Sequence, residues 1–264
     1  MTAKGLKSRL RCIVPLRREQ KVLVYHMGKV GSTSIFESLV SAGVRNINHM
    51  NRMNPANIEL VRQEHRERGL PVPEGDEEGL RVYEDIRTTP YRVRCISPVR
   101  DPIRRNLSAF FFGYERFTGE KYEPGGLDVD RLRRCFLEEY PHDVPLTWFD
   151  VELKHTLGVN VYRQPFPKET GFATISCRNC RVLLLKCELP DSRKEAAIRQ
   201  FLALPAFALK NENVGADKIY AAAYRQFLGT IKLPDDYLDR MCNAEYTRHF
   251  YSDDEIDAMR TRWR

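Results

Sequence analysis

Near the N-terminus a short apolar run, residues 22–25, stops at a glycine and gives way to a loop of small and hydroxyl-bearing residues. The run is partly β-branched and aromatic, a composition typical of a buried strand. From Ser32 onward apolar residues recur at helical spacing, and Gly43 supplies a stop at the helix C-terminus. A strand, a glycine-bearing loop and a helix in this order predict an α/β fold.

Strand and helix patterns continue to alternate beyond this unit. The further strands predicted in the first half of the sequence are 44–48, 80–84 and 93–99. A helix is predicted with Asn54 as its cap, Pro55 at its first position and Gly69 at its end. Residues 71–79 are acidic and rich in proline and glycine, which predicts a loop. The predicted fold class is α/β, a single domain with a mostly parallel central sheet flanked by helices.

The C-terminal half is predicted to be mainly helical. The expected helical stretches are 127–140, 145–157, 191–204, 216–229, 234–247 and 252–262. Residues 181–187 are the exception, because they are apolar enough for a central strand. Cys177 and Cys180 precede them in C-x-x-C spacing, but no second such pair follows to complete a zinc site. A hairpin turn between strands at 171–176 and 181–187 is the favoured interpretation.

The length and the charge distribution bound the domain organisation. A chain of 264 residues suffices for one large domain. The formal net charge is +7, but residues 1–21 hold seven basic residues and one acidic residue, so the remainder is nearly balanced. A nucleic-acid-binding domain would carry its basic face on the folded body, so no nucleic-acid partner is expected. We expect a basic lead-in over 1–20, which could alternatively lie against an anionic acceptor or a lipid surface, and a domain over 21–264.

Neither a secretory signal nor a membrane span is expected from the sequence. The first twenty residues lack the apolar stretch of a secretory signal, and no run approaches the ~20 apolar residues of a membrane span. Seven cysteines, an odd number, fit a reducing compartment better than a disulfide framework. The expectation is a cytoplasmic protein without a transmembrane segment.

A loop between a parallel strand and a helix suits a phosphate, because backbone N–H groups and the positive end of the helix dipole meet there. The nucleotide-kinase motif, in which lysine follows the second of two glycines, fails because the only Gly-Lys pair is Gly28-Lys29 and Leu23 stands five residues before it. The dinucleotide fingerprint fails as well. The predicted phosphate ligands are Gly28, Lys29, Val30, Gly31, Ser32, Thr33 and Ser34.

A second anion site is predicted where the strand 93–99 ends. Arg100 leaves the C-terminal end of this strand, and Ser108 lies one helical turn beyond Arg104 on the same face. The cation and the hydroxyl can therefore converge on one anion. Two phosphate sites at the ends of neighbouring strands suit a nucleotide that carries both a 3′- and a 5′-phosphate.

Both segments resemble signatures of the sulfotransferases that use 3′-phosphoadenosine 5′-phosphosulfate (PAPS). Residues 28–34 look like the 5′-phosphosulfate loop of that superfamily, and 95–111 look like the segment whose arginine and serine, here Arg100 and Ser108, bind the 3′-phosphate. The resemblance implies a P-loop NTPase-like sulfotransferase fold, PAPS as co-substrate, its desulfated form PAP as product, and no metal. It also implies that Lys29 meets the leaving oxygen.

The general base is open among three residues. His49, eighteen residues after Gly31, stands where tyrosylprotein and heparan sulfate glucosaminyl sulfotransferases, which the chain resembles, place a carboxylate. An imidazole, with a pKa of about 6.5, suits this task near neutrality, but His49 could equally be a structural loop residue. Glu84 and Asp85 end the predicted strand 80–84, where many cytosolic sulfotransferases place a base histidine. Their alternative role is a surface strand end or a salt bridge with Arg87.

Other residues near these segments receive supporting roles. His26 directly precedes the loop and is expected to shape it. Asp101 is expected to cap the helix that follows, and Arg105 to lie on its solvated face. Residues 149–154 are predicted to line the acceptor pocket.

More loosely, residues 148–162, 171–175 and 246–263 look like parts of bacterial proteins described as capsular polysaccharide biosynthesis proteins, which carry a sulfotransferase-like loop. The predicted function is transfer of a sulfuryl group from PAPS to a hydroxyl or an amine of a carbohydrate or other small acceptor. The alternatives are a kinase-like phosphotransferase that uses Mg-ATP and a non-catalytic, nucleotide-binding partner in capsule assembly.

Overall fold

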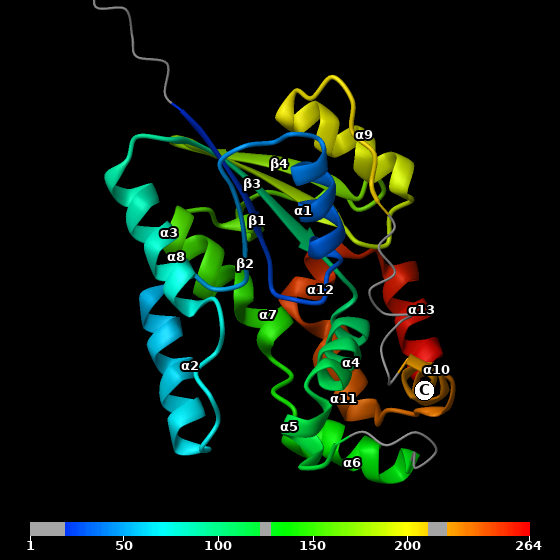
Figure 1. Cartoon of the computed structure of the whole chain (residues 1–264). Coiled ribbons are helices and arrows are strands. Elements are labelled where there is room, and N and C mark those ends of the chain that lie inside the picture. Colours follow the sequence, from blue (N-terminus) through cyan, green and yellow to red (C-terminus); the bar gives the residue numbers. More distant parts are fainter. Residues whose placement is uncertain (1–18, 122–127, 211–220) are drawn as a thin grey trace, which may run out of the picture.

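The computed structural model describes residues 19–121, 128–210 and 221–264, and its centre is a five-stranded sheet (Figure 1). The strands are β1 Gln20–Tyr25, β2 Ile47–Met50, β3 Arg92–Val99, β4 Phe172–Cys177 and β5 Cys180–Lys186. They lie in the order β2-β1-β3-β5-β4, and all neighbours are parallel except β4 and β5. The prediction of a single α/β domain with a mostly parallel sheet is confirmed. The predicted lead-in 1–20 lies almost wholly outside the described residues.

Helices surround this sheet on both faces (Figure 1). In the first half they are α1 Ser32–Ser41, α2 Pro55–Glu67, α3 Asp76–Thr88, α4 Pro102–Phe112 and α5 Tyr114–Thr118. In the second half they are α6 Val129–Glu139, α7 Val144–Trp148, the π-helical η1 Phe149–Lys154, α8 His155–Leu157, the 3₁₀ turn η2 Val161–Arg163, α9 Asp191–Leu202, α10 Ala221–Thr230, α11 Asp235–Asn243, α12 Glu245–Phe250 and α13 Asp253–Trp263. The start of the predicted helix 216–229 falls outside the described residues.

Alternation along the strands divides the core between the two faces. Val22 and Val24 of β1 pack in a cluster with α1 and α9, whereas Leu23 and Tyr25 pack with α4, η1 and the C-terminal helices. All four side chains are buried. A strand buried on both faces is expected for the inner strands of a parallel sheet, and it explains why β1 is a continuous apolar run.

The predicted strand over 80–84 is wrong, because these residues lie inside α3. The predicted loop over 71–79 is shortened for the same reason, since α3 begins at Asp76. Three acidic residues in the first turn of α3 stabilise the helix N-terminus through its dipole. Gly79 and Val82, three residues apart, are buried on the same side of the helix. A five-residue pattern is too short to reveal this spacing.

Local signals at other boundaries are confirmed. The Asn54 side chain accepts a hydrogen bond from the Ala56 N–H, and Pro55 is the first residue of α2. Cys177 lies opposite Cys180 in the antiparallel β4–β5 pair, so the C-x-x-C segment is a hairpin turn. Within 19–121, 128–210 and 221–264, no three His, Cys, Asp or Glu side chains are arranged to hold a metal ion. None of the helices in these ranges is long and apolar enough to cross a membrane.

Candidate functional site

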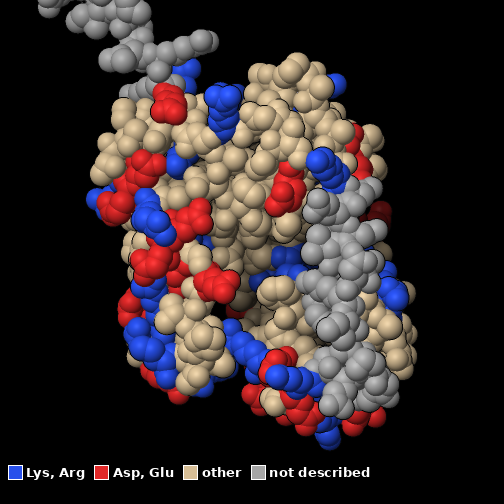
Figure 2. Space-filling model, in the orientation of Figure 1, with Lys and Arg blue, Asp and Glu red and all other residues tan. Residues whose placement is uncertain are grey.

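The predicted anion sites follow two neighbouring parallel strands, β1 and β3, so they meet at one edge of the sheet. They are in direct contact, because Arg100 Nη1 donates a hydrogen bond to the carbonyl oxygen of Lys29 at 2.7 Å. In the orientation of Figure 1 the molecular surface is hollowed near this loop, and Lys and Arg atoms lie inside the hollow (Figure 2). The structure therefore brings the loop and the end of β3 together.

The loop after β1 is built from left-handed backbone. Gly28, Lys29 and Gly31 have φ angles of 79°, 58° and 74°. Glycine adopts positive φ angles without steric cost, and two of these three residues are glycines. Gly31 is the N-cap of α1 and provides no side-chain hydrogen bond to it. The first N–H groups of α1 thus lack an intrahelical or capping acceptor, as an anion site at a helix N-terminus requires.

The three hydroxyl residues of the loop have different surroundings. Ser32 Oγ lies 3.0 Å from His49 Nε2. Ser34 Oγ donates a hydrogen bond of 2.6 Å to the carbonyl oxygen of Lys210. Thr33 is exposed at the start of α1. Thr33 can turn toward an anion at the loop, whereas Ser32 and Ser34 would first have to release His49 and Lys210.

Lys29 lies over an aromatic ring of α4. Its Nζ is 4.4 Å from the centroid of the Phe112 ring, so the ammonium group gains a cation–π interaction. The Lys29 side chain is half-buried at the mouth of the loop. The ammonium charge is therefore held on the α4 side of the loop.

The backbone of Arg100 is fixed by a residue from the C-terminal helices. The Arg100 N–H donates to the Tyr246 hydroxyl at 3.0 Å, and this hydroxyl donates to the Arg100 carbonyl oxygen at 2.8 Å. Tyr246 is fully buried in α12. No local sequence pattern predicts this contact, because the two residues are 146 positions apart. Ser108 lies further along α4 and is half-buried.

Asp101 is confirmed as the N-cap of α4. Its side chain accepts hydrogen bonds from the N–H groups of Ile103 and Arg104, at 2.9 Å and 3.1 Å. Burial, with a smaller contribution from the nearby Glu188 carboxylate, raises the pKa of the Asp101 carboxyl to about 6. The Asp101 N–H in turn donates to Glu188 at 2.8 Å. This chain of contacts fixes the turn that carries Arg100.

Arg105 was predicted to be solvated, and this prediction is wrong. Its side chain is buried beneath the loop and donates to the carbonyl oxygens of Met27 at 2.6 Å and Gly28 at 3.3 Å. It also donates to the Tyr140 hydroxyl at 2.7 Å and to Asn106 Oδ1 at 3.0 Å. Helix α4 is buried over most of its circumference because the loop covers the side that spacing alone assigns to solvent. Arg105 therefore holds the loop carbonyls in place.

His49 lies beside the loop, in a stack of rings. Its ring centroid is 4.5 Å from that of His26 and 5.0 Å from that of Phe36. Burial lowers the pKa of His49, and the Glu78 carboxylate opposes this shift. The imidazole is accordingly neutral near pH 7, the state in which it can accept a proton.

His26 has a role in the loop backbone. Its Nδ1 accepts a hydrogen bond from the Gly28 N–H at 2.9 Å. Burial, together with the neighbouring His49 and Arg105, lowers the pKa of His26 well below its ordinary value. His26 is therefore neutral, and its acceptor nitrogen supports the turn at Gly28.

Glu84 and Asp85 are not at the end of a strand, because both lie on α3. Asp85 accepts a hydrogen bond of 2.7 Å from Lys21, near the start of β1 and thus at the opposite end of the sheet from the loop. Glu84 is exposed and forms a 3.5 Å ion pair with Arg87. Neither carboxylate lies beside the loop, so His49 is the one of the three base candidates that the structure places there.

Sequence reasoning also missed the buried carboxylate of Glu152. Located in η1, it accepts hydrogen bonds from the N–H groups of Met53 and Asn54, from Asn57 Nδ2 and from the Tyr25 hydroxyl. One side chain thereby joins the end of β1 to the start of α2. A polar residue in an otherwise apolar helical pattern is the signal that could have marked it.

Two cavities border the loop on its two sides. One of about 160 Å³ is lined by Val30, Gly31 and Ser34 of the loop and α1, and by Pro98 and Cys187 at the ends of β3 and β5. The other, of about 230 Å³, is bordered by Met27 and Arg105 and extends between α2 and α7. Of residues 149–154, which were predicted to line the acceptor pocket, Val151 lines this second cavity.

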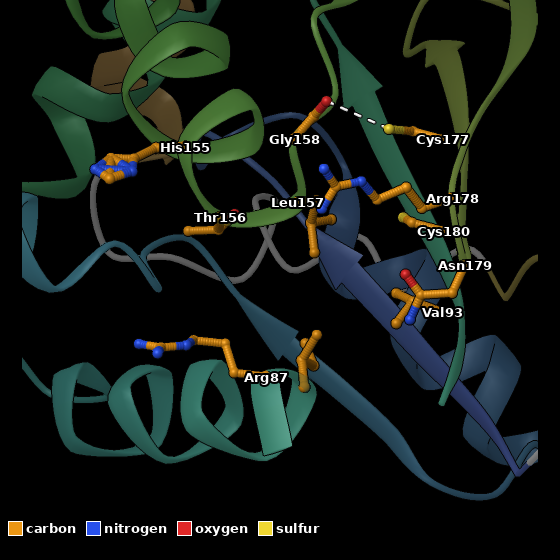
Figure 3. A pocket seen from close by; sticks show the side chains of 11 residues that line it. Arg87, Val93, His155, Thr156, Leu157, Gly158, Cys177, Arg178, Asn179 and Cys180 are labelled. Atoms are coloured by element: carbon orange, nitrogen blue, oxygen red, sulfur yellow. Dashed lines mark hydrogen bonds between the residues drawn. The ribbon is translucent and has the colours of Figure 1, made fainter. Parts of the chain in front are cut away.

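The larger cavity of about 450 Å³ in Figure 3 lies elsewhere. It is formed by the β4–β5 turn, by α8 and by the start of β3, at the end of the sheet remote from the loop. Arg178 of the turn points across it toward Leu157, and Cys177 Sγ contacts the Gly158 carbonyl oxygen at 3.5 Å (Figure 3). Size alone therefore does not identify the site.

Comparison with known proteins gives one match. No curated protein and no solved structure matches the chain. Residues 129–252 match the model of the family described as "putative capsular polysaccharide synthesis protein". The matched range runs from α6 to just beyond α12 and includes Glu152 and Tyr246, but neither the loop nor Arg100. Over this range, and not over the whole chain, the sequence is similar to the capsular polysaccharide synthesis family.

Proposed function

We propose that this protein transfers a sulfuryl group from PAPS to a hydroxyl or an amine of a carbohydrate or other small acceptor. The observation that carries the proposal is the contact between Arg100 and the Lys29 carbonyl oxygen. It joins a left-handed, glycine-bearing loop at a helix N-terminus to a cation at the end of the next strand. A nucleotide with phosphates at both its 5′ and 3′ positions has anionic groups for both places.

In this mechanism the loop and α1 hold the 5′-phosphosulfate, and Arg100 with Ser108 holds the 3′-phosphate. The acceptor oxygen or nitrogen forms a bond to sulfur while the bond from sulfur to the 5′-phosphate oxygen breaks. Lys29 neutralises the charge that develops on this leaving oxygen. The acceptor proton passes to the neutral imidazole of His49.

The match of residues 129–252 supports a carbohydrate acceptor and a role in capsular polysaccharide synthesis. The matched range contributes Val144, Thr147, Trp148 and Val151 to the cavity between α2 and α7, and it does not include the loop. Tyr246, in the matched range, anchors Arg100.

The proposal is tested first by thermal shift with PAP, PAPS, ADP and Mg-ATP. A ligand at one hundred times its Kd stabilises the folded state by about 2.7 kcal/mol. We expect PAP and PAPS to raise the Tm by several degrees more than ADP or Mg-ATP at equal concentration, because only they carry the 3′-phosphate. A larger shift with Mg-ATP would favour the kinase-like alternative. Tight PAP binding without transfer to any acceptor of a panel would favour a non-catalytic partner.

The pH dependence of kcat tests His49. A base acts only when unprotonated, so activity is lost as the pH falls through the pKa of the folded enzyme. Because burial lowers the pKa of His49, we expect kcat to fall below about pH 6.5 and to be constant from pH 7 upward. His49→Gln should remove this transition and lower kcat by roughly 10²–10⁴-fold. A transition that persists in His49→Gln would assign the base to another group.

A further inference from the structure

The cavity between α2 and α7 has a defined place and size. Met27 and Arg105, which contact the loop, form one wall, and its volume is about 230 Å³. Pockets for drug-sized ligands run to roughly 300–1,000 Å³, so this one suits a smaller group. Asn51, which follows β2, also lines it, and it stands two residues beyond His49 in the chain. The cavity therefore adjoins the loop.

The charged residues of this cavity are already engaged. Arg52 donates through Nε and Nη2 to the buried carboxylate of Asp76, at 3.0 Å and 2.9 Å. Arg105 directs its N–H groups to loop carbonyls and to Tyr140 and Asn106. The lining residues include no carboxylate. The cavity thus offers a ligand neither a carboxylate nor an unengaged guanidinium group.

Neutral polar groups remain available in the lining. Asn57 Nδ2 donates to Glu152, which fixes the amide and leaves its oxygen able to accept. The Asn51 side chain is exposed and makes no hydrogen bond to the described part of the chain. Thr147 Oγ donates to the Asp143 carbonyl oxygen and keeps its own lone pairs. The groups on offer are therefore amides and a hydroxyl.

The remaining lining is apolar and rigid. Trp148 is buried, and its indole N–H donates to the Asn51 carbonyl oxygen at 2.9 Å, which fixes the ring. Val61, Val144 and Val151 surround it. A sugar ring presents hydroxyls at its rim and C–H groups on its faces, and it matches a lining of amides around aromatic and aliphatic surface.

From these observations we infer that the cavity binds one uncharged sugar unit, whose hydroxyl faces the loop and is the acceptor group. The assignment of the sugar hydroxyl as the acceptor group rests on the proposed sulfuryl transfer. The binding of an uncharged sugar rests on the lining of the cavity alone. An acidic sugar is disfavoured, because the guanidinium groups of Arg52 and Arg105 already donate to protein acceptors, and turning one toward a carboxylate would break the bonds that hold Asp76 or the loop. The specificity-determining residues are Asn51, Asn57 and Thr147.

Saturation-transfer NMR on the full chain, without nucleotide, tests the inference. The probes are the methyl glycosides of glucose, galactose and N-acetylglucosamine, compared with methyl glucuronide. Thr147→Trp would fill the cavity from an exposed position. Thr88→Trp is a matched control, because Thr88 is also exposed, helical and bonded through its hydroxyl to the carbonyl four residues earlier.

At least one neutral glycoside should receive saturation in the native chain and in Thr88→Trp, and at least fivefold less in Thr147→Trp. Glucuronide should receive several-fold less than that glycoside. No signal from any neutral glycoside, an unchanged signal in Thr147→Trp, or glucuronide as the strongest ligand would overturn the inference. The thermal shift with PAP separates the two proposals. If sugar binds but PAP does not, the sugar-binding inference stands and the proposed sulfuryl transfer fails. If PAP binds but no sugar does, the nucleotide-binding part of the proposed function stands and the sugar-binding inference fails.

Discussion

Arg105→Met is expected to lower the free energy of unfolding by about 3 kcal/mol. The substitution removes four hydrogen bonds and leaves buried acceptors at Met27, Gly28, Tyr140 and Asn106 unpaired. Each unpaired buried acceptor destabilises the folded state by about 1–3 kcal/mol. Part of this loss is offset, because the variant no longer has to desolvate a charged guanidinium group on folding. Methionine retains the packing of the aliphatic stem. Urea denaturation of both proteins measures the difference.

The same variant should weaken PAP binding, because two of the lost bonds hold the backbone of the nucleotide loop. Arg104→Met is the control for stability, since Arg104 is the adjacent residue of α4, is half-buried and makes no side-chain hydrogen bond to described residues. We expect its unfolding free energy to change by less than about 1 kcal/mol. If Arg105→Met were as stable as Arg104→Met, the buried guanidinium would not be what supports the loop.

Lys29→Ala is expected to reduce sulfuryl transfer by roughly 10²–10³-fold, the usual effect of losing one group that stabilises developing charge. The left-handed backbone at position 29 is about equally unfavourable for lysine and for alanine, so the substitution should not destabilise the loop and the fold should be retained. The effect should fall on kcat more than on the Kd of PAP, because PAP carries no sulfuryl group. Single-turnover rates and PAP titrations measure the two quantities separately.

Lys154→Ala provides the comparison, because Lys154 is exposed, lies on η1 and pairs only with Asp150 among the described residues. It removes the same charge from the chain without touching the loop, so transfer should stay within about twofold of the native rate. Equal activity of the native protein and Lys29→Ala would remove Lys29 from the mechanism.

Much of the fold could be predicted where local chemistry decides the structure. The apolar run before Gly28, the cap at Asn54 and the turn at Cys177 each carry their signal within a few residues. Residues 80–84 misled because a short mixed pattern fits a strand as well as one face of a helix. The acidic first turn of α3, which begins at Asp76, was the better evidence.

The only part of the candidate site that could be predicted from the sequence is the part whose residues directly follow predicted strands. The loop and Arg100 leave the ends of neighbouring strands, so topology brings them together. Arg105, Glu152 and Tyr246 act through partners far away in sequence, and no local pattern specifies such contacts. For Arg105 the helical spacing even gave the wrong environment, because it cannot show that a loop covers that side of α4.

The paired hydrogen bonds between Tyr246 and the Arg100 backbone have an evolutionary consequence. A lineage could not exchange its C-terminal helices for an unrelated set without losing the hydroxyl that fixes Arg100. Descendants that take new acceptors would instead accumulate substitutions on α2 and α7, whose side chains line the cavity. Among homologous chains, tyrosine at the position of Tyr246 should therefore vary less than asparagine or threonine at the positions of Asn57 and Thr147.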